Sequence, residues 1–293
     1  MKFLERLLAI DRRWLYIVIW LVVMVPLIFP FVIKPEATPP VQQLFNHIDT
    51  MPEERALVIS VDYTPDTEPE LHPMYIALMR HAFATGRRVG VLSTGVLGLG
   101  LGEAGIRQVS EEFNARATTH ADSIINGEDY VYWGWTTPFL TVLLGMGEKI
   151  SNVFTVDYYG TPTESLPIMA ELRNYDDIGI VVSIAGTSVP LSWINYAQTQ
   201  FGVPIGCGVT AVSAADFYPY LNSGQFTGML AGMKGAAEYE ELVENKMAGV
   251  GLDWGLRRKG TEAMSSQTAA HIAIMIFIII GNAAYFLTRG RKR

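Results

Sequence analysis

The sequence contains very little cysteine: Cys207 is the only one among 293 residues. A single cysteine excludes an intramolecular disulfide and a cysteine-based metal site, so a hydrophobic core must hold the fold together. Cys207 lies in an apolar stretch, where a buried and unreactive thiol is the usual outcome. The chain also lacks a Gly-x-Ser-x-Gly sequence and a pair of histidines at metal-binding spacing. We therefore predict no catalytic residue, no metal and no cofactor from motifs.

Positive charge is scarce in the middle of the chain. The whole sequence carries −7, and its two ends, residues 1–13 and 288–293, contribute +2 and +4, which leaves −13 for the rest. An acidic domain binds nucleic acid poorly, because affinity for phosphates depends on Lys and Arg. We expect no nucleic-acid partner, whereas cations, neutral ligands and basic proteins remain open.

Two long uncharged apolar runs lie near the ends of the chain, at residues 14–33 and 269–287. A helix needs roughly 20 apolar residues to cross a bilayer core of about 30 Å, so we predict two transmembrane helices and a membrane bilayer as partner. A cleaved signal peptide is the alternative for the first run. It fits less well, because the run exceeds the ~7–15 residues of a signal core and no small-x-small cleavage site follows.

Basic residues lie before the first run and after the second, at the two termini of the chain. The positive-inside rule therefore places both termini in the cytoplasm. Arg257, Arg258 and Lys259 oppose this orientation, since they precede the second run on the proposed outer side. We predict a two-pass protein of the cell (inner) membrane with an extracytoplasmic domain. Its predicted segments are a cytoplasmic N-terminus (1–13), a transmembrane helix (14–33), a neck (34–55), an α/β domain (56–248), a linker (249–268), a transmembrane helix (269–287) and a cytoplasmic tail (288–293).

Apolar strand-like runs alternate with helical patterns through the middle of the chain. The predicted strands are 56–63, 88–94, 129–135, 153–157, 178–185 and 204–210, and the main predicted helices are 70–85, 103–115, 138–150, 191–201 and 224–244. Continuous apolar strands separated by helices indicate a parallel sheet covered on both faces. We predict an α/β fold with a doubly wound, mostly parallel sheet, Rossmann-like or flavodoxin-like, flanked by the two transmembrane helices.

Polar residues and glycines follow most of the predicted strands. In doubly wound sheets, ligands bind beyond the carboxyl ends of the strands. The candidate ligand-binding residues are Asp62, Tyr63, Thr94, Gly95, Asp157, Tyr158, Gly186, Thr187, Thr210 and Ser213. We predict that Asp62, Asp157 and Thr187 converge at one edge of the sheet. The alternative is that these residues only form turns and helix caps, as such loops commonly do.

Three motifs suggest other chemistries. The glycines between Gly100 and Gly105 match the Gly-x-Gly-x-x-Gly nucleotide fingerprint, but they follow the second predicted strand and not the first. The acidic residues from Asp62 to Glu70 could hold a cation, although capping of the next helix explains them equally. Ser213 with Asp216 and a histidine could form a hydrolase set only if the fold brought them together.

Four glycines recur at helical spacing in the predicted helix 224–244: Gly224, Gly228, Gly232 and Gly235. Such a face predicts a close packing partner, either the domain's own sheet or another protomer. Asn282 lies in the second apolar run, where an amide side chain favours a partner helix. We therefore expect a homo-oligomer or a membrane-complex partner, with these five residues as candidate interface positions.

Several strings resemble a prokaryotic membrane-protein family that has an anchor–α/β domain–anchor layout and no known function. They are Asp157-Tyr-Tyr-Gly-Thr-Pro162, Gly208-Val-Thr-Ala-Val-Ser-Ala214, and the tyrosine-rich segments 217–225 and 234–240. The resemblance implies a prokaryotic cell membrane as the setting, and it implies no activity. From the residues we expect a membrane-tethered binding or assembly module. The alternative is a membrane-anchored hydrolase or transferase that acts on a small or lipid-linked substrate at the strand ends.

Overall fold

The computed structural model describes residues 11–29, 31 and 34–289 of the chain. It divides into two compact units. Met1–Lys34 and Thr261–Arg293 form one unit, which contains helix α2 (Arg12–Ile28) and most of helix α12 (Lys259–Arg289). Pro35–Gly260 forms the other, which we call the α/β domain.

A six-stranded, all-parallel sheet forms the centre of the α/β domain. The strands are β1 (Ala56–Asp62), β2 (Val89–Ser93), β3 (Tyr130–Trp135), β4 (Ile178–Ala185), β5 (Ile205–Val209) and β6 (Met229–Ala231). Their order across the sheet, β3-β2-β1-β4-β5-β6, is the doubly wound order of dinucleotide-binding domains. The predicted α/β class and parallel sheet are confirmed. Because the strand order reverses between β1 and β4, the switch point lies there.

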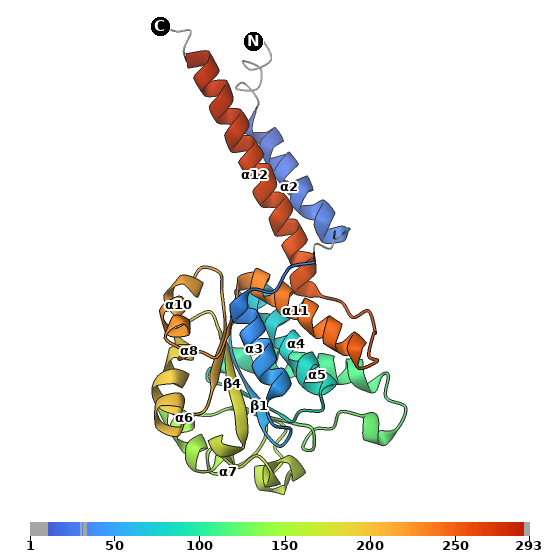
Figure 1. Cartoon of the computed structure of the whole chain (residues 1–293), viewed down its shortest axis with the longest axis vertical. Coiled ribbons are helices and arrows are strands. Elements are labelled where there is room, and N and C mark those ends of the chain that lie inside the picture. The colour runs from blue at the N-terminus through green and yellow to red at the C-terminus, as the bar shows by residue number, and fades with distance from the viewer. Residues whose placement is uncertain (1–10, 30, 32–33, 290–293) are drawn as a thin grey trace. The chain divides into compact units, whose positions relative to one another are not determined.

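Helices cover both faces of the sheet (Figure 1). On one face lie α3 (Pro39–Thr50), α4 (Glu68–Ala84), α5 (Leu99–Asn114) and α11 (Gly232–Gly249). On the other lie α6 (Phe139–Glu148), α7 (Ile150–Val153), α8 (Val189–Ser192), the π-helical turn η6 (Trp193–Gln198), α9 (Thr199–Phe201) and α10 (Ala214–Asn222). Short 3₁₀ turns complete the connections: η1 (Val96–Gly98), η2 (His120–Asp122), η3 (Thr163–Ser165), η4 (Pro167–Ala170) and η5 (Tyr175–Asp177).

The two hydrophobic cores follow from strand geometry. Successive side chains of a strand point to opposite faces. In β1, Leu57, Ile59 and Val61 therefore pack under α4 and α11, whereas Ala56 and Val58 pack against the opposite layer. Both faces are buried, which explains why these strands read as continuous apolar runs.

The predicted strand 153–157 is wrong. The chain ends α7 at Val153 and then folds back on itself, with a single bridge between Val156 and Pro162. Asp157 Oδ1 accepts hydrogen bonds from the amides of Tyr159 and Thr161, at 3.0 and 2.7 Å. This carboxylate holds the segment as a tight loop, because it satisfies amides that a neighbouring strand would otherwise bind.

The predicted helix 224–244 is also wrong in its first part. Gly224 lies in a turn after α10, β6 runs from Met229 to Ala231, and the helix α11 starts only at Gly232. Gly232 has a φ of 61°, a value that glycine adopts readily and other residues rarely do. The short strand was hidden in the sequence because its three residues fit a helical pattern as well.

Residues 250–258 connect α11 to α12, and we call them the strap. Leu252, Trp254 and Leu256 alternate along it and pack onto the core on the α4–α11 side of the sheet. The strap is also held by polar contacts: Arg80 Nη1 donates to the carbonyl of Arg257 at 3.0 Å. The predicted linker is therefore a packed part of the α/β domain up to residue 260.

Among the described residues, one helix is long and apolar enough to cross a membrane: Lys259–Leu287, within α12. The first predicted span coincides largely with α2, whose 17 residues begin with Arg12 and Arg13 and are otherwise mostly apolar and exposed; this helix does not reach the spanning length, so the second of the two predicted spans alone has support. Positions 30, 32 and 33 of that predicted span lie outside the described residues, as do 1–10 and 290–293. The finding supports association with a membrane through the C-terminal helix.

Candidate functional site

The carboxyl ends of the strands form one edge of the sheet, and most of the sequence-predicted residues lie there. Asp62 ends β1 and pairs in register with Ala185, the last residue of β4. Gly186 and Thr187 follow β4 directly. The same edge carries Tyr63 after β1, Thr94 and Gly95 after β2, and Thr210 and Ser213 after β5.

Asp62 is enclosed by hydrogen bonds at the switch point. Its Oδ1 accepts from both the amide and the hydroxyl of Thr94, each at 2.7 Å, and its Oδ2 accepts from Ser60 Oγ at 2.5 Å. Burial raises the pKa of the Asp62 carboxyl, and these hydrogen bonds oppose the rise. The carboxylate thus joins the ends of β1 and β2, and its hydrogen-bonding capacity is largely used within the protein.

Tyr63 turns into the core and not into the strand-end crevice. It is 1% exposed, and its hydroxyl lies 2.7 Å from Nδ1 of His72 on α4. Burial lowers the pKa of His72 to about 4, so the imidazole is neutral at neutral pH. This pair fixes the start of α4 beneath the first strand–helix turn.

The acidic residues at the start of α4 brace neighbouring loops. Glu70 Oε1 accepts a hydrogen bond from the amide of Ala211, 2.7 Å away, in the loop after β5. In the same loop, Thr210 Oγ1 and Ser213 Oγ lie 2.5 Å apart. No group of three or more His, Cys, Asp or Glu side chains within the described residues is placed to hold a metal ion.

Asp157 and Tyr158 lie at a different place from Asp62. The amide of Tyr158 donates to the carbonyl of Tyr132 at 2.8 Å, beside the outer edge of β3. Since β3 is two strands from β1, the structure separates this pair from Asp62 and Thr187. The strand at 153–157 on which the expected convergence was based does not form, and the convergence of Asp62, Asp157 and Thr187 stays a prediction.

The loop that contains Asp157 instead borders a groove of about 270 Å³ at the carboxyl end of β3. We call it the β3 groove. Its lining residues are Leu99, Trp133, Gly134, Trp135, Thr136, Val153, Phe154, Thr155, Val156, Asp157 and Tyr158. Trp135 and Tyr158 are each about two-fifths exposed, and the Trp133 and Phe154 rings stack with centroids 5.8 Å apart. Aromatic walls with a few polar groups are typical of small-molecule sites.

Three buried polar atoms around this groove and its loop have no hydrogen-bond partner within the described part of the chain. They are Trp133 Nε1, Asn126 Oδ1 and Thr163 Oγ1. Trp133 lines the groove, Asn126 Nδ2 contacts Asp157 at 3.5 Å, and the Thr163 amide donates to the carbonyl of Thr155. Buried polar atoms are usually paired, and these three are enclosed by the protein, so they do not face the opening of the groove.

The Gly-x-Gly-x-x-Gly motif serves tyrosine packing. A Cβ on Gly102 would lie 2.7 Å from the hydroxyl of Tyr132, and a Cβ on Gly105 would lie 2.3 Å from a ring carbon of Tyr75. The Tyr75 hydroxyl donates to the carbonyl of Gly102 at 3.0 Å. These glycines lie in α5 and not in the turn after β1, which contains no glycine. The motif is therefore explained without a nucleotide.

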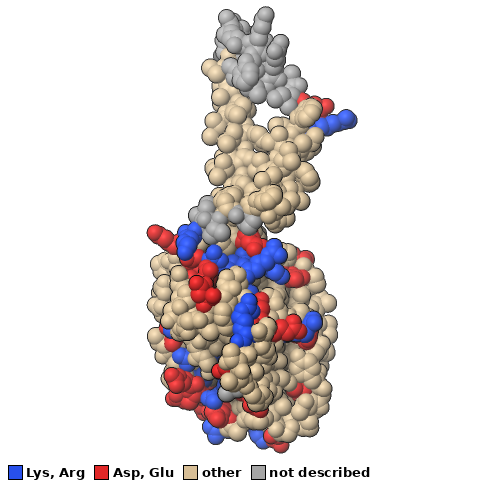
Figure 2. Space-filling view, turned by 90° about the vertical axis from the view of Figure 1, so that its right-hand side faces the viewer, with Lys and Arg blue, Asp and Glu red and all other residues tan. Residues whose placement is uncertain are grey.

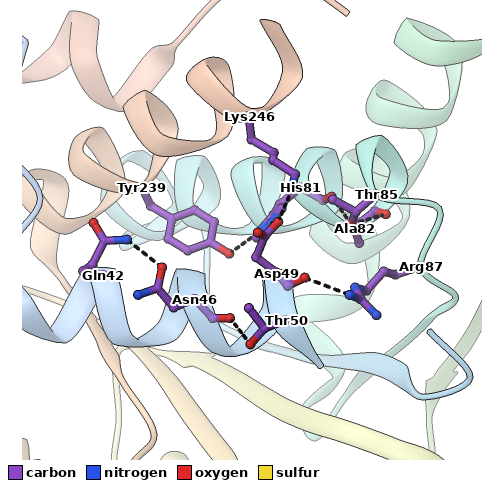
Figure 3. A network of polar contacts seen from close by, with 10 residues as sticks. All are labelled: Gln42, Asn46, Asp49, Thr50, His81, Ala82, Thr85, Arg87, Tyr239 and Lys246. Atoms are coloured by element: carbon purple, nitrogen blue, oxygen red, sulfur yellow. Dashed lines mark hydrogen bonds and ion pairs between the residues drawn. The ribbon is translucent and has the colours of Figure 1, made fainter. Parts of the chain in front are cut away.

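A second histidine lies in a polar network that connects α3, α4 and α11 (Figure 3). His81 Nδ1 lies 2.7 Å from the Tyr239 hydroxyl, and its Nε2 lies 3.4 Å from Asp49 Oδ1. Lys246 approaches the same carboxylate oxygen at 2.7 Å. The Asp–His–Tyr order is that of a proton relay, but His81 and Tyr239 are both fully buried. The network therefore joins helices and offers no surface to a substrate.

Comparison of the chain with protein-family models, with curated proteins and with solved structures found no match. Function must therefore be argued from the geometry.

The four glycines predicted to line one helical face do not share a helix. Gly224 and Gly228 precede β6, whereas Gly232 and Gly235 belong to α11. A Cβ on Gly228 would lie 2.5 Å from the backbone nitrogen of Leu44, so α3 of the same chain packs there. The interface prediction for these residues loses its geometric basis, and that for Asn282, an exposed residue of α12, stays a prediction.

Sequence reasoning missed the β3 groove as a site, although it selected Asp157 and Tyr158 from its border. The available signal was the aromatic content of β3, Tyr-Val-Tyr-Trp-Gly-Trp, in which three of six residues lie in the groove wall. Three of the four rings are buried, and only Trp135, at the end of the strand, is exposed, so the sequence pattern alone did not mark the groove.

Proposed function

We propose that this protein is a two-pass membrane protein whose α/β domain lies outside the cytoplasm and binds a small ligand in the β3 groove. The basic ends of the chain support this orientation. Arg257, Arg258 and Lys259 count less against this orientation than the sequence alone suggests. Arg258 Nη1 pairs with Glu241 and Glu244, each at 2.5 Å, so its charge is balanced inside the domain.

The groove wall carries the proposal for the ligand class. Trp135 and Tyr158 supply exposed aromatic rings, and Thr136 and Thr155 supply hydroxyls at the same opening. An anionic ligand is disfavoured by the acidic domain. A neutral molecule with flat apolar faces and hydroxyl groups at its rim, such as a sugar unit, fits both the rings and the threonine hydroxyls.

The enzyme alternative at the switch point has less support. Asp62 is occupied by Thr94 and Ser60, and the nearest histidine along the chain, His72, is bound to Tyr63 in the core. A general base must reach its substrate, which these contacts oppose. Assembly with a second copy or another membrane protein through α12 remains part of the proposal, since Asn282 gains from a polar partner in the bilayer.

Binding should be tested on the full chain in lipid nanodiscs, with glucose, N-acetylglucosamine and their short oligomers as probes, by calorimetry and tryptophan fluorescence. We expect one of these probes to bind and Trp135→Ala to weaken it about tenfold, because one aromatic contact contributes about 1.5 kcal/mol. Tyr218→Ala is the matched control, since Tyr218 is an exposed tyrosine on α10, outside the groove lining. Absence of binding, or equal loss in both variants, would contradict the proposal.

Orientation is tested separately. A reporter that is active only in the cytoplasm, inserted after Ser223 in the exposed turn that follows α10, should give no signal in cells. The same reporter fused after Arg293 should give a strong one. A signal at the first position would reverse the topology.

A further inference from the structure

Two loops at the carboxyl edge of the sheet expose apolar side chains at their tips. Val212, between β5 and α10, is 92% exposed, and Val96 and Leu97, between β2 and α5, are 55% and 64% exposed. Because β2 and β5 are separated by β1 and β4, the tips lie on either side of the switch point, about 14 Å apart at ~4.8 Å per strand. Single exposed apolar residues are ordinary, so this feature needs a second observation.

That observation is the place at which the membrane segments join the α/β domain. On the N-terminal side, the amide and hydroxyl of Thr38 donate to Glu238 Oε2, at 3.0 and 2.6 Å. On the C-terminal side, the amide of Gly260 donates to Glu240 Oε1 at 3.0 Å. Both attachments are therefore made to a single turn of one helix, α11.

The start of α11 locates these attachments relative to the sheet. Gly232 follows β6 directly, so α11 begins at the carboxyl edge. Glu238 and Glu240 come six and eight residues later, about 9–12 Å along the helix at 1.5 Å per residue. Both membrane connections therefore attach to the half of the domain that borders the apolar tips.

The connections are also short. Residues 34–37 separate Thr38 from the predicted first span, which allows at most about 18 Å of extended chain. From Gly260 to the second apolar run at residue 269, α12 rises about 13 Å. The headgroup layer on each side of a bilayer core is roughly 5–8 Å thick, so a domain held this closely brings one edge to the membrane surface.

The two loops that carry the apolar tips are uncharged, whereas the β1–α4 connection and the first turn of α4, which lie between them, carry Asp66, Glu68 and Glu70. The segments that carry the tips, residues 94–102 and 203–215, contain no charged residue, although residues 14–287 together carry −13. Figure 2 shows Lys, Arg, Asp and Glu side chains spread over one face of the domain. Uncharged loops with apolar tips suit the interfacial layer of a bilayer, where apolar side chains are favourable.

We infer that the carboxyl edge of the sheet faces the bilayer in which the chain is anchored, with Val96, Leu97 and Val212 in the lipid headgroup region. This inference rests on the proposed anchoring by both apolar segments. A ligand that enters from this edge would then come from the membrane surface. The partner of the apolar tips is lipid. Zwitterionic lipid is enough for this contact, because the tip loops contain no basic residue that would need an anionic headgroup.

Depth measurements in nanodiscs test the inference, and the buried Cys207 makes the labelling selective. Val212→Cys and Leu97→Cys, each in the full chain, are labelled with a fluorophore. Quenching of its fluorescence is measured with nitroxide-labelled lipid headgroups and, separately, with aqueous iodide. Val250→Cys is the matched control, because Val250 is an exposed valine at the far end of α11. We expect nitroxide lipid to remove most of the fluorescence at positions 212 and 97 and little at 250, in both zwitterionic and anionic nanodiscs.

Three other outcomes overturn the inference, and they are distinguishable. Iodide quenching at position 212 equal to that at 250, with the protein still in the nanodisc, means that the edge faces water. Protection from both quenchers that depends on protein concentration means that a protein covers it. Failure to co-elute with nanodiscs refutes the anchoring as well, and with it the proposed function.

Discussion

Lowering the pH should destabilise the folded protein through His81 well before the carboxylates are protonated. His81 is fully buried, and burial lowers its pKa from 6.5 to about 4. Between these values the unfolded chain binds a proton that the folded chain excludes, so the free energy of unfolding falls as the pH falls. A difference of about 2.5 pKa units corresponds to roughly 3 kcal/mol, present in full above pH 6.5 and lost by pH 4.

The double variant His81→Phe with Tyr239→Phe removes the titrating group and its hydrogen-bond partner together. At pH 7 its stability should stay within about 1 kcal/mol of the natural chain, because removing both partners of a buried hydrogen bond is nearly neutral. The phenyl ring at position 81 should still stack on Phe45, because the centroids of the Phe45 and His81 rings lie 4.3 Å apart. Between pH 7 and 4.5 the variant should lose roughly 2–3 kcal/mol less stability than the natural chain.

Urea unfolding of the full chain in mild detergent, followed by near-ultraviolet circular dichroism at a series of pH values, measures this difference. His72 and Asp62 titrate in both proteins and therefore cancel from the comparison. Ile48→Ala is the control: it truncates a fully buried residue and should cost about 2–5 kcal/mol equally at every pH. If the double variant and the natural chain lose equal stability between pH 7 and 4.5, His81 is not neutral in the folded protein and the reasoning is wrong.

Three further predictions concern packing and attachment. Gly105→Ala should cost about 1–3 kcal/mol in urea midpoint measurements, since its Cβ would lie 2.3 Å from the Tyr75 ring, whereas Gly100→Ala, with open space, should be neutral or stabilising. Equal effects of the two substitutions would contradict the packing role of these glycines and favour a ligand-binding role for the motif. Cys207 should resist a thiol reagent in the native protein and react fully in urea, because burial raises the pKa of its thiol; rapid native labelling would refute the buried placement. Glu240→Ala should lower the thermal midpoint and increase hydrogen exchange at the start of α12, and unchanged exchange there would show that this carboxylate does not hold the helix.

The parallel sheet could be predicted because its strands are buried on both faces. Ile178–Ala185 contains only apolar residues, glycine and one serine, and its bounds were predicted as observed. The edge strand β6 and the loop before Asp157 gave misleading signals. Met229–Ala231 has three residues, too few for any period to show, and the run before Asp157 looked like a strand although a side-chain carboxylate closes it into a loop.

The candidate site was predictable only in part, for a related reason. Residues that follow buried strands were found correctly, but side-chain direction was not visible in the sequence. Tyr63 follows β1 yet points inward to His72. Asp62 accepts hydrogen bonds from Thr94 within the protein. The β3 groove depends on a loop more than twenty residues away in sequence. No local pattern predicts that the amide of Tyr158 donates a hydrogen bond to the carbonyl of Tyr132 in β3.

The attachment of both membrane connections to α11 has a mechanical consequence. A pull on either connection loads hydrogen bonds at Glu238 or Glu240, and from there the packing of α11 on α4, which the strap reinforces through Trp254. With both segments anchored as proposed, a pull on the N-terminal connection would have to pass the packing of α3 on α11 before it reached β1, which follows α3 in the chain. The strand β3 lies two strands from β1, so such a load would reach the groove beside it only through the sheet.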